Sequence, residues 1–226
     1  MTDAEIEREK RDAEDLAKAV GGVLALLLGL TPSAATVSWD GPRGRFIVDG
    51  QVVSIQTVRR EMRRFETAVG VRMSRIATDL EKGRLNLDGW RDAMMKLVGS
   101  SHVVAAALAS GTVSKAVRNT KVQERVAAER KYVTGFAAAI AAKKLARRTI
   151  VARAKSYLLA AFITYSIVEL AVRKIVGYTE AQRITTARES CEECRAIAYQ
   201  WIPILEMPSI GSLQCGSRCR CFCEYR

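Results

Sequence analysis

The chain has 226 residues, of which 49% are hydrophobic and 27% charged, so it can bury a sizeable core as one large or two small domains. Aromatic residues make up only 6%, while Ala, Leu, Val and long charged side chains dominate, which favours a mainly α protein. The net charge of +12 suits polyanions or acidic protein surfaces as partners, and the N-terminus lacks the basic-then-apolar order of a secretory signal.

The N-terminal region, 1–35, is expected to form a helix or arm. It is charged at first and becomes apolar from Val20 to Leu30. An apolar run this short cannot cross a bilayer, which needs about twenty residues in a helix. We therefore expect a helix that is buried in the protein or that docks into a partner's groove.

A β-hairpin is predicted near the N-terminal third, in region 36–56. Alternating and β-branched residues lie on either side of Asp49-Gly50. An Asp-Gly pair between such runs is a strong signal for a two-residue turn, because both turn positions need positive φ. The pattern predicts strands near Arg45 to Val48 and Gln51 to Ile55.

A helical body is predicted for region 57–188. Between Thr57 and Lys82, apolar residues recur at spacings of three or four, which indicates an amphipathic helix. These residues are Val58, Met62, Phe65, Val69, Met73, Ile76 and Leu80. Gly83 ends this helix, and Asn86 or Asp88 can cap the next one.

Two long helices are expected later in this body, from Ser101 to Lys131 and from Thr134 to Ile175, with Gly111 and Gly135 as possible breaks. Such helices can form a bundle or lie extended. The stretch from Ser156 to Val172 is apolar and near the lower length limit for a membrane span. Glu and Ser residues interrupt its apolarity, so we interpret it as a central bundle helix, with a membrane span or a peripheral helix as alternatives.

Basic residues are concentrated between Ser114 and Lys155, where twelve of them stand against two glutamates. Several recur at helical spacing and form cationic stripes that can lie along phosphates. The candidate nucleic-acid-binding residues are Arg118, Lys121, Arg125, Lys144, Arg147 and Arg148. The alternatives are a solvated helix face and a contact with acidic protein. No residue pattern reads base edges, so any DNA contact should be independent of sequence and sensitive to salt.

The single histidine, His102, gives little support for catalysis. A catalytic triad or a histidine-based metal centre needs further partners, and the sequence contains neither a GxxxxGK[ST] loop nor a GxGxxG motif after a strand. We therefore expect no enzymatic activity and no small-molecule substrate. His102 is expected at a helix start or on the surface.

The C-terminal module, 189–226, contains all six cysteines of the chain. Their spacing is Cys191-x2-Cys194, then Cys215-x3-Cys219-x-Cys221-x-Cys223. Close pairs separated by about fifteen to twenty residues suit a tetrahedral ion, and a reducing cytoplasm favours metal ligands over disulfides. The predicted ligands of a structural zinc ion are Cys191, Cys194, Cys215 and one of Cys219 or Cys221, with Cys223 as a bystander. Buried reduced cysteines and disulfides are the alternatives.

The run CEEC, followed by AYQWIPI, MP-x-x-G and C-x3-CRC, resembles the C-terminal signature of tailed-phage minor head proteins, the head morphogenesis or Mu F-like family. The matching residues are Cys191, Cys194, Trp201, Pro203, Pro208, Gly211, Cys215, Cys219 and Cys221. The segments LEKGRLNLDGWRDAMMKLVGSSHVVAAALASG and WDGPRGRFIVDGQVVS are also similar to parts of such phage proteins. The chain departs from the pattern at Tyr199-Gln200, where a Gly commonly precedes the Trp, and Cys223 is extra.

The resemblance implies a structural component of a double-stranded DNA phage head and no enzyme. It implies several copies per particle, inside the capsid or at the portal vertex, and residence in the bacterial cytoplasm during assembly. The implied partners are portal protein, major capsid protein or both, together with packaged DNA bound without sequence preference. Two other functions stay open, namely a zinc-dependent nucleic-acid-binding protein and a membrane-associated phage protein.

Overall fold

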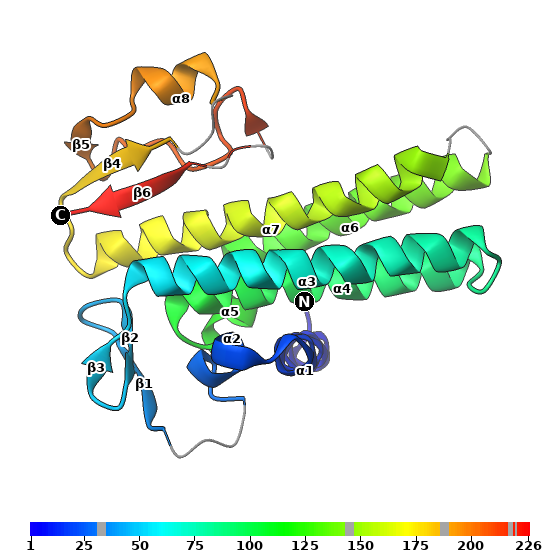
Figure 1. Ribbon diagram of the computed structural model, residues 1–226, viewed down its shortest axis with the longest axis horizontal. Coiled ribbons are helices and arrows are strands. Elements are labelled where there is room, and N and C mark those ends of the chain that lie inside the picture. The colour runs from blue at the N-terminus through cyan, green and yellow to red at the C-terminus, as the bar shows by residue number, and fades with distance from the viewer. Residues whose placement is uncertain (31–34, 143–146, 186–189, 217–218, 220) are drawn as a thin grey trace.

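Long helices form the body of the protein, which confirms the predicted mainly α class. In the computed structural model they are α3 (Ile55–Glu81), α4 (Leu87–Ser110), α6 (Thr120–Ala141) and α7 (Arg147–Ile175). They run side by side as a bundle (Figure 1), so the chain adopts the bundled and not the extended arrangement. The structure describes residues 1–30, 35–142, 147–185, 190–216, 219 and 221–226.

Capping side chains fix the starts of α3 and α4. The Ser54 hydroxyl accepts the Thr57 N–H at 3.1 Å and begins α3. The Asn86 side chain accepts the Gly89 N–H at 2.8 Å and begins α4. The predicted amphipathic helix is thus confirmed, and Asn86 is the cap of the helix that follows it.

The helix predicted from Ser101 to Lys131 is wrong as a single element. Gly111 ends α4 with φ 93°, the short helix α5 (Val113–Arg118) follows, and Asn119 caps α6. A Cβ atom at Gly111 would lie 2.2 Å from the Trp39 indole, so both the backbone conformation and the close approach require glycine. The break considered at Gly135 does not occur, because this residue lies within α6.

Helix α4 lies at the centre of the body. Every residue from Leu97 to Ala109 is buried, because α1 (Asp3–Val20), α3, α5, α6 and α7 pack around it. Among the described residues, α4 is the one helix with the length and composition to cross a membrane, and 78% of its apolar window is buried inside the protein. Such burial is typical of a core helix. The apolar stretch from Ser156 to Val172 lies in α7, which packs against α3 and α4.

The N-terminal region forms two helices instead of one. Gly21 and Gly22 have φ of 69° and 66° and separate α1 from α2 (Gly22–Leu27). Leu24 and Leu27 are buried in the core, so the apolar part of this region packs within the protein. Residues 31–34, at the end of the predicted N-terminal arm, lie outside the described residues.

An ion pair between buried Glu9 and half-buried Arg130 joins α1 to α6 across α4. The Glu9 carboxylate of α1 accepts a hydrogen bond from the Arg130 guanidinium of α6. The pair passes over Gly99 of α4, where a Cβ atom would lie 2.6 Å from Glu9 Oε2 and 2.7 Å from Arg130 Nη2. The missing side chain of Gly99 therefore provides the space for the pair.

The predicted hairpin is confirmed within a three-stranded antiparallel sheet. Strand β2 (Arg45–Val48) pairs with β3 (Gln51–Val52) around Asp49 and Gly50, whose φ angles are 50° and 77°. Strand β1 (Val37–Asp40) was not predicted and pairs with the other edge of β2. The second predicted strand was too long, because Ile55 already belongs to α3.

The C-terminal module contains a second three-stranded antiparallel sheet, which the sequence did not predict. Strand β4 (Glu180–Ile184) lies between β5 (Trp201–Pro203) and β6 (Phe222–Tyr225), and the short helix α8 (Glu192–Ala196) connects β4 to β5. Strand β4 falls in the region 57–188 assigned to the helical body, but it pairs with strands of the module. The module lies against one end of α7 (Figure 1).

Buried polar contacts hold the module against α3 and α7. The Arg59 guanidinium donates to the Cys223 carbonyl and lies 3.7 Å from the Glu169 carboxylate. Glu169 also accepts hydrogen bonds from the hydroxyls of Tyr165 at 2.9 Å and Tyr225 at 3.3 Å. Burial, reinforced by the Glu169 charge, holds the pKa of both tyrosines well above the usual range, so both hydroxyls remain donors.

A close contact also joins the module to α7 at Gly211. This residue has φ 81°, and a Cβ atom there would lie 2.6 Å from Ile163 Cδ1. A larger residue would need both a strained backbone and a shift of the module away from the helix. Gly211 therefore allows the module to approach α7 closely.

Candidate metal centre

Helix α8 brings Cys191 and Cys194 together. Cys191 is the N-cap residue, and its carbonyl accepts the Arg195 N–H at 3.0 Å. A spacing of three residues over one helical turn places both thiols on the same side. The Glu193 carboxylate accepts the Gln214 N–H at 2.6 Å, which fastens α8 to the segment that leads into the next cysteine.

Five cysteines form two overlapping groups that share Cys194. One group is Cys191, Cys194 and Cys215, the other is Cys194, Cys219 and Cys221, and within each the sulfur atoms lie within 4.8 Å of one another. Cys194 Sγ lies 3.6 Å from Cys215 Sγ and 3.9 Å from Cys219 Sγ. A tetrahedral ion with sulfur ligands at about 2.3 Å separates those sulfurs by about 3.8 Å. The cysteine cluster can therefore hold a metal ion.

The thiols of the cluster differ in their tendency to ionise. A hydrogen bond with the Cys221 thiol is the largest influence on Cys219 and lowers its pKa to about 4. Burial is the largest influence on Cys194 and Cys215 and raises the pKa of both thiols. Cys219 thus ionises more readily than Cys194 or Cys215, and metal binding to the whole set would release the remaining protons.

Arg183 of β4 lies next to the cluster and was missed by the sequence analysis. Its side chain is fully buried, and Nη1 donates to Cys194 Sγ at 3.4 Å while Nη2 donates to the Pro208 carbonyl. A buried guanidinium beside sulfur favours the thiolate form. The available signal was the alternation in β4, where Ala181 and Arg183 face inward, so that a cation occupies a core position of a short strand.

Cys223 lies outside both groups of thiols. It is buried on β6, and burial raises its pKa to about 11. Its carbonyl accepts the hydrogen bond from Arg59 described above. The backbone of Cys223 therefore belongs to the contact between module and bundle, whereas its thiol stays protonated at neutral pH.

The predicted nucleic-acid-binding residues are described only in part. Arg118 at the end of α5 and Lys121 at the start of α6 are exposed, and Arg125 is half-buried. Lys121 Nζ lies 3.6 Å from a carboxylate oxygen of Glu124. Lys144 and the side chains of Arg147 and Arg148 lie outside the described residues. The structure therefore describes the stripe of Arg118, Lys121 and Arg125, but not the side chains of the stripe of Lys144, Arg147 and Arg148.

The position expected for His102 is wrong. The residue is fully buried in the middle of α4, and Nδ1 lies 2.7 Å from the Thr164 hydroxyl of α7. Burial lowers the pKa of His102 to about 3, so the imidazole is neutral at physiological pH. Ser100 and Ser101 beside it are buried as well, which shows that this polar run belongs to the core.

Comparisons of the chain with models of protein families, with curated proteins and with solved structures found no match. The protein is a helical bundle that carries a cysteine-rich module able to hold a metal ion.

Proposed function

We propose that the protein is a structural component of a tailed-phage head, in which a zinc ion stabilises the C-terminal module. The observation that carries the metal part is the thiol cluster around Cys194, whose sulfur separations match those of a tetrahedral thiolate site. The resemblance of the motif from Cys191 to Cys221 supports the head part. A site closed by four thiolates leaves no open position, so the role is architectural and not catalytic.

We take Cys191, Cys194 and Cys215, which form one of the two groups, as three of the ligands, and Cys219 of the other group as the fourth. Cys215 interacts with the other three, and Cys219 also lies near Cys194. Cys221 is grouped with Cys194 and Cys219 and is the alternative fourth ligand. Zinc with four thiolates carries two negative charges, which the buried Arg183 guanidinium partly offsets through its bond to Cys194.

Metal analysis of the purified full chain tests the zinc site. Atomic emission should detect about one zinc per chain in the wild type, no zinc in Cys194→Ser, and an unchanged amount in the matched variant Cys223→Ser. Both variants exchange a buried thiol in the same module, but only Cys194 lies in the cluster. A wild-type chain that folds without metal, or equal loss in both variants, would contradict the proposed site.

The head assignment is tested separately from the metal. The proposal places the protein in the virion, with portal or major capsid protein as its partner, and in the host cytoplasm before assembly. Mass spectrometry of purified particles should find the protein in several copies, and crosslinking should join it to one of these two partners. Its absence from purified particles would remove the head assignment and leave the zinc site untouched.

Packaged DNA is proposed as a further partner through Arg118 and Lys121, which are exposed near the junction of α5 and α6. Contacts made through phosphates weaken steeply as salt rises. The double variant Arg118→Gln/Lys121→Gln should reduce the slope of log affinity against log salt by about one for each charge removed. DNA binding that is unchanged from low to high salt would exclude this contact.

A further inference from the structure

A polar cavity of about 200 Å³ lies where the bundle, the N-terminal sheet and the C-terminal module meet. Its lining includes three arginines from three different elements, Arg45 on β2, Arg59 on α3 and Arg173 on α7. The module contributes aromatic walls, including Trp201 and Tyr225. The one carboxylate in the lining is Glu224, which is exposed. The cavity therefore has an excess of positive charge.

The arginines retain hydrogen-bond donors that the protein does not use. Among the described residues, the Arg45 side chain has no hydrogen-bond or ion-pair partner, although it is only partly exposed. Arg59 is 7% exposed, and its buried Nε has no hydrogen-bond acceptor within the described part of the chain. Arg173 Nη1 donates to the carbonyls of Arg43 and Gly44, which fixes this guanidinium beside β2.

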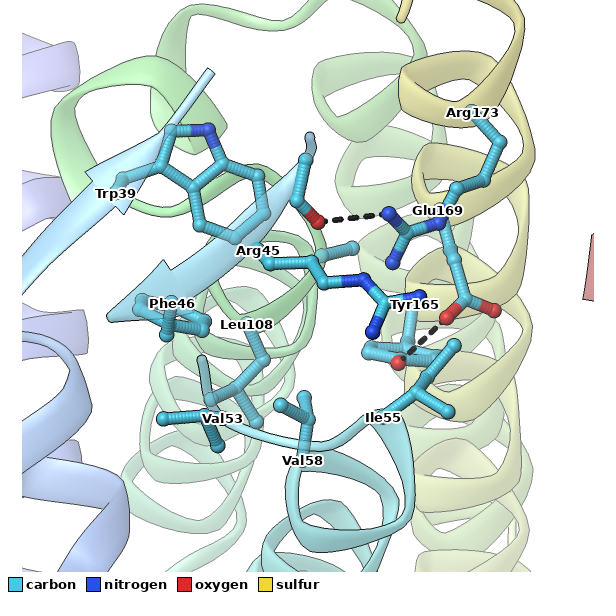
Figure 2. A pocket seen from close by; sticks show the side chains of 12 residues that line it. Trp39, Arg45, Phe46, Val53, Ile55, Val58, Leu108, Tyr165, Glu169 and Arg173 are labelled. Carbon is cyan, nitrogen blue, oxygen red and sulfur yellow. Dashed lines mark hydrogen bonds between the residues drawn. The ribbon is translucent and has the colours of Figure 1, made fainter. Parts of the chain in front are cut away.

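The nearest buried carboxylate does not neutralise this excess. Figure 2 shows Arg45 reaching from β2 toward α7, where Arg173, Glu169 and Tyr165 lie close together in an adjoining narrow pocket. Glu169 already accepts hydrogen bonds from two tyrosine hydroxyls and lies 3.7 Å from Arg59. One carboxylate among three guanidinium groups leaves donors for a further acceptor. An unpaired buried donor costs free energy, so a bound acceptor is favoured.

We propose that this cavity binds an oxyanion of the phosphate type, held by Arg45, Arg59 and Arg173. Guanidinium groups match the geometry of phosphate oxygens and form strong charge-assisted hydrogen bonds with them. The two glutamates, Glu169 and Glu224, leave one of the three guanidinium charges without a counter-charge, which a bound phosphate can supply. A phosphate ion is also smaller than the cavity, which leaves room for water or for the first atoms of a phosphate ester. The three arginines come from β2, α3 and α7, so the proposed anion contacts use no residue of the thiol cluster.

Titration calorimetry of the full chain with inorganic phosphate tests this site, with acetate as the monoanionic comparison. Arg45→Gln removes a guanidinium that has no hydrogen-bond or ion-pair partner among the described residues, so the variant should fold like the wild type. The matched control is Arg75→Gln, which removes an exposed charge about 24 Å further along α3 from Arg59. Phosphate should bind the wild type once per chain, and Arg45→Gln should weaken binding about tenfold or more while Arg75→Gln leaves it unchanged.

Short oligonucleotides with and without a 5′-phosphate distinguish the source of the anion. A preference for the phosphorylated strand that Arg45→Gln removes supports the end of a nucleic acid as the ligand. Phosphate binding without such a preference supports the free ion. A folded wild-type chain that does not bind phosphate at millimolar concentration overturns the proposal. Equal losses in Arg45→Gln and Arg75→Gln also overturn it, because they indicate diffuse attraction to a basic protein.

Discussion

His102 offers a test confined to one side chain, because the chain contains a single histidine. Burial disfavours the imidazolium and lowers the pKa from 6.5 to about 3. Between these two pKa values the unfolded chain binds more protons than the folded chain. Stability therefore does not depend on His102 titration above pH 6.5, and it falls as the pH decreases from 6.5 toward 3. From pH 7 to pH 5 this residue alone should lower the free energy of unfolding by about 2 kcal/mol.

Urea unfolding of the wild type and of His102→Asn at both pH values isolates this contribution. Asparagine can keep a hydrogen bond to Thr164 but does not titrate, so titration of all other groups cancels in the comparison. In a chain without a histidine tag, the imidazole NMR resonances of the folded protein should not move between the two pH values. A histidine that titrates near its ordinary pKa, or the same pH dependence in both proteins, would refute a buried neutral imidazole.

Three further predictions, two of them with a companion variant, can be tested by urea unfolding at neutral pH. Gly99→Ala should destabilise the protein by about 2 kcal/mol, because displacing the ion pair of Glu9 outweighs a helix-propensity gain of about 1 kcal/mol. Its companion Gly135→Ala has open space around the added Cβ and should stabilise the protein by up to about 1 kcal/mol. Gly211→Ala should lower the free energy of unfolding by about 2 kcal/mol, because the added Cβ collides with Ile163. Adding Ile163→Val should recover part of this loss, whereas additive losses in the double variant would contradict the collision. Glu169→Gln should cost about 3 kcal/mol by leaving a buried arginine without its counter-charge, and an unchanged unfolding midpoint would count against that role.

Local signals predicted the elements whose structure depends on neighbouring residues. The Asp49-Gly50 turn has the positive φ angles that its residue types allow, and the amphipathic pattern before Gly83 produced a continuous helix. Gly111 was identified as a possible break, and it ends α4. Gly135 was an equally plausible break by composition, but packing of α6 on α4 keeps the helix continuous there.

Features that depend on distant contacts escaped the sequence analysis. The strands of the module contain only a few residues each, and β4 pairs with β6 across about forty positions of the chain, so alternation alone was too weak a signal. His102 was misplaced because a helix was expected to begin at Ser101, whereas α4 begins at Leu87 and five helices surround it. The cysteine spacing predicted the cluster, but not Arg183, whose role depends on the fold of β4.

The short distance along the chain between the thiol cluster and strand β6 couples metal binding to docking of the module. Cys221 lies at the thiol cluster, and two positions later the Cys223 carbonyl receives the hydrogen bond from Arg59 of the bundle. Any ion that orders this strand also favours docking of the module, and docking must favour binding of the ion by the same free energy. Metal affinity measured on the whole chain should therefore exceed that of a chain whose docking contacts at Arg59 or Glu169 have been removed.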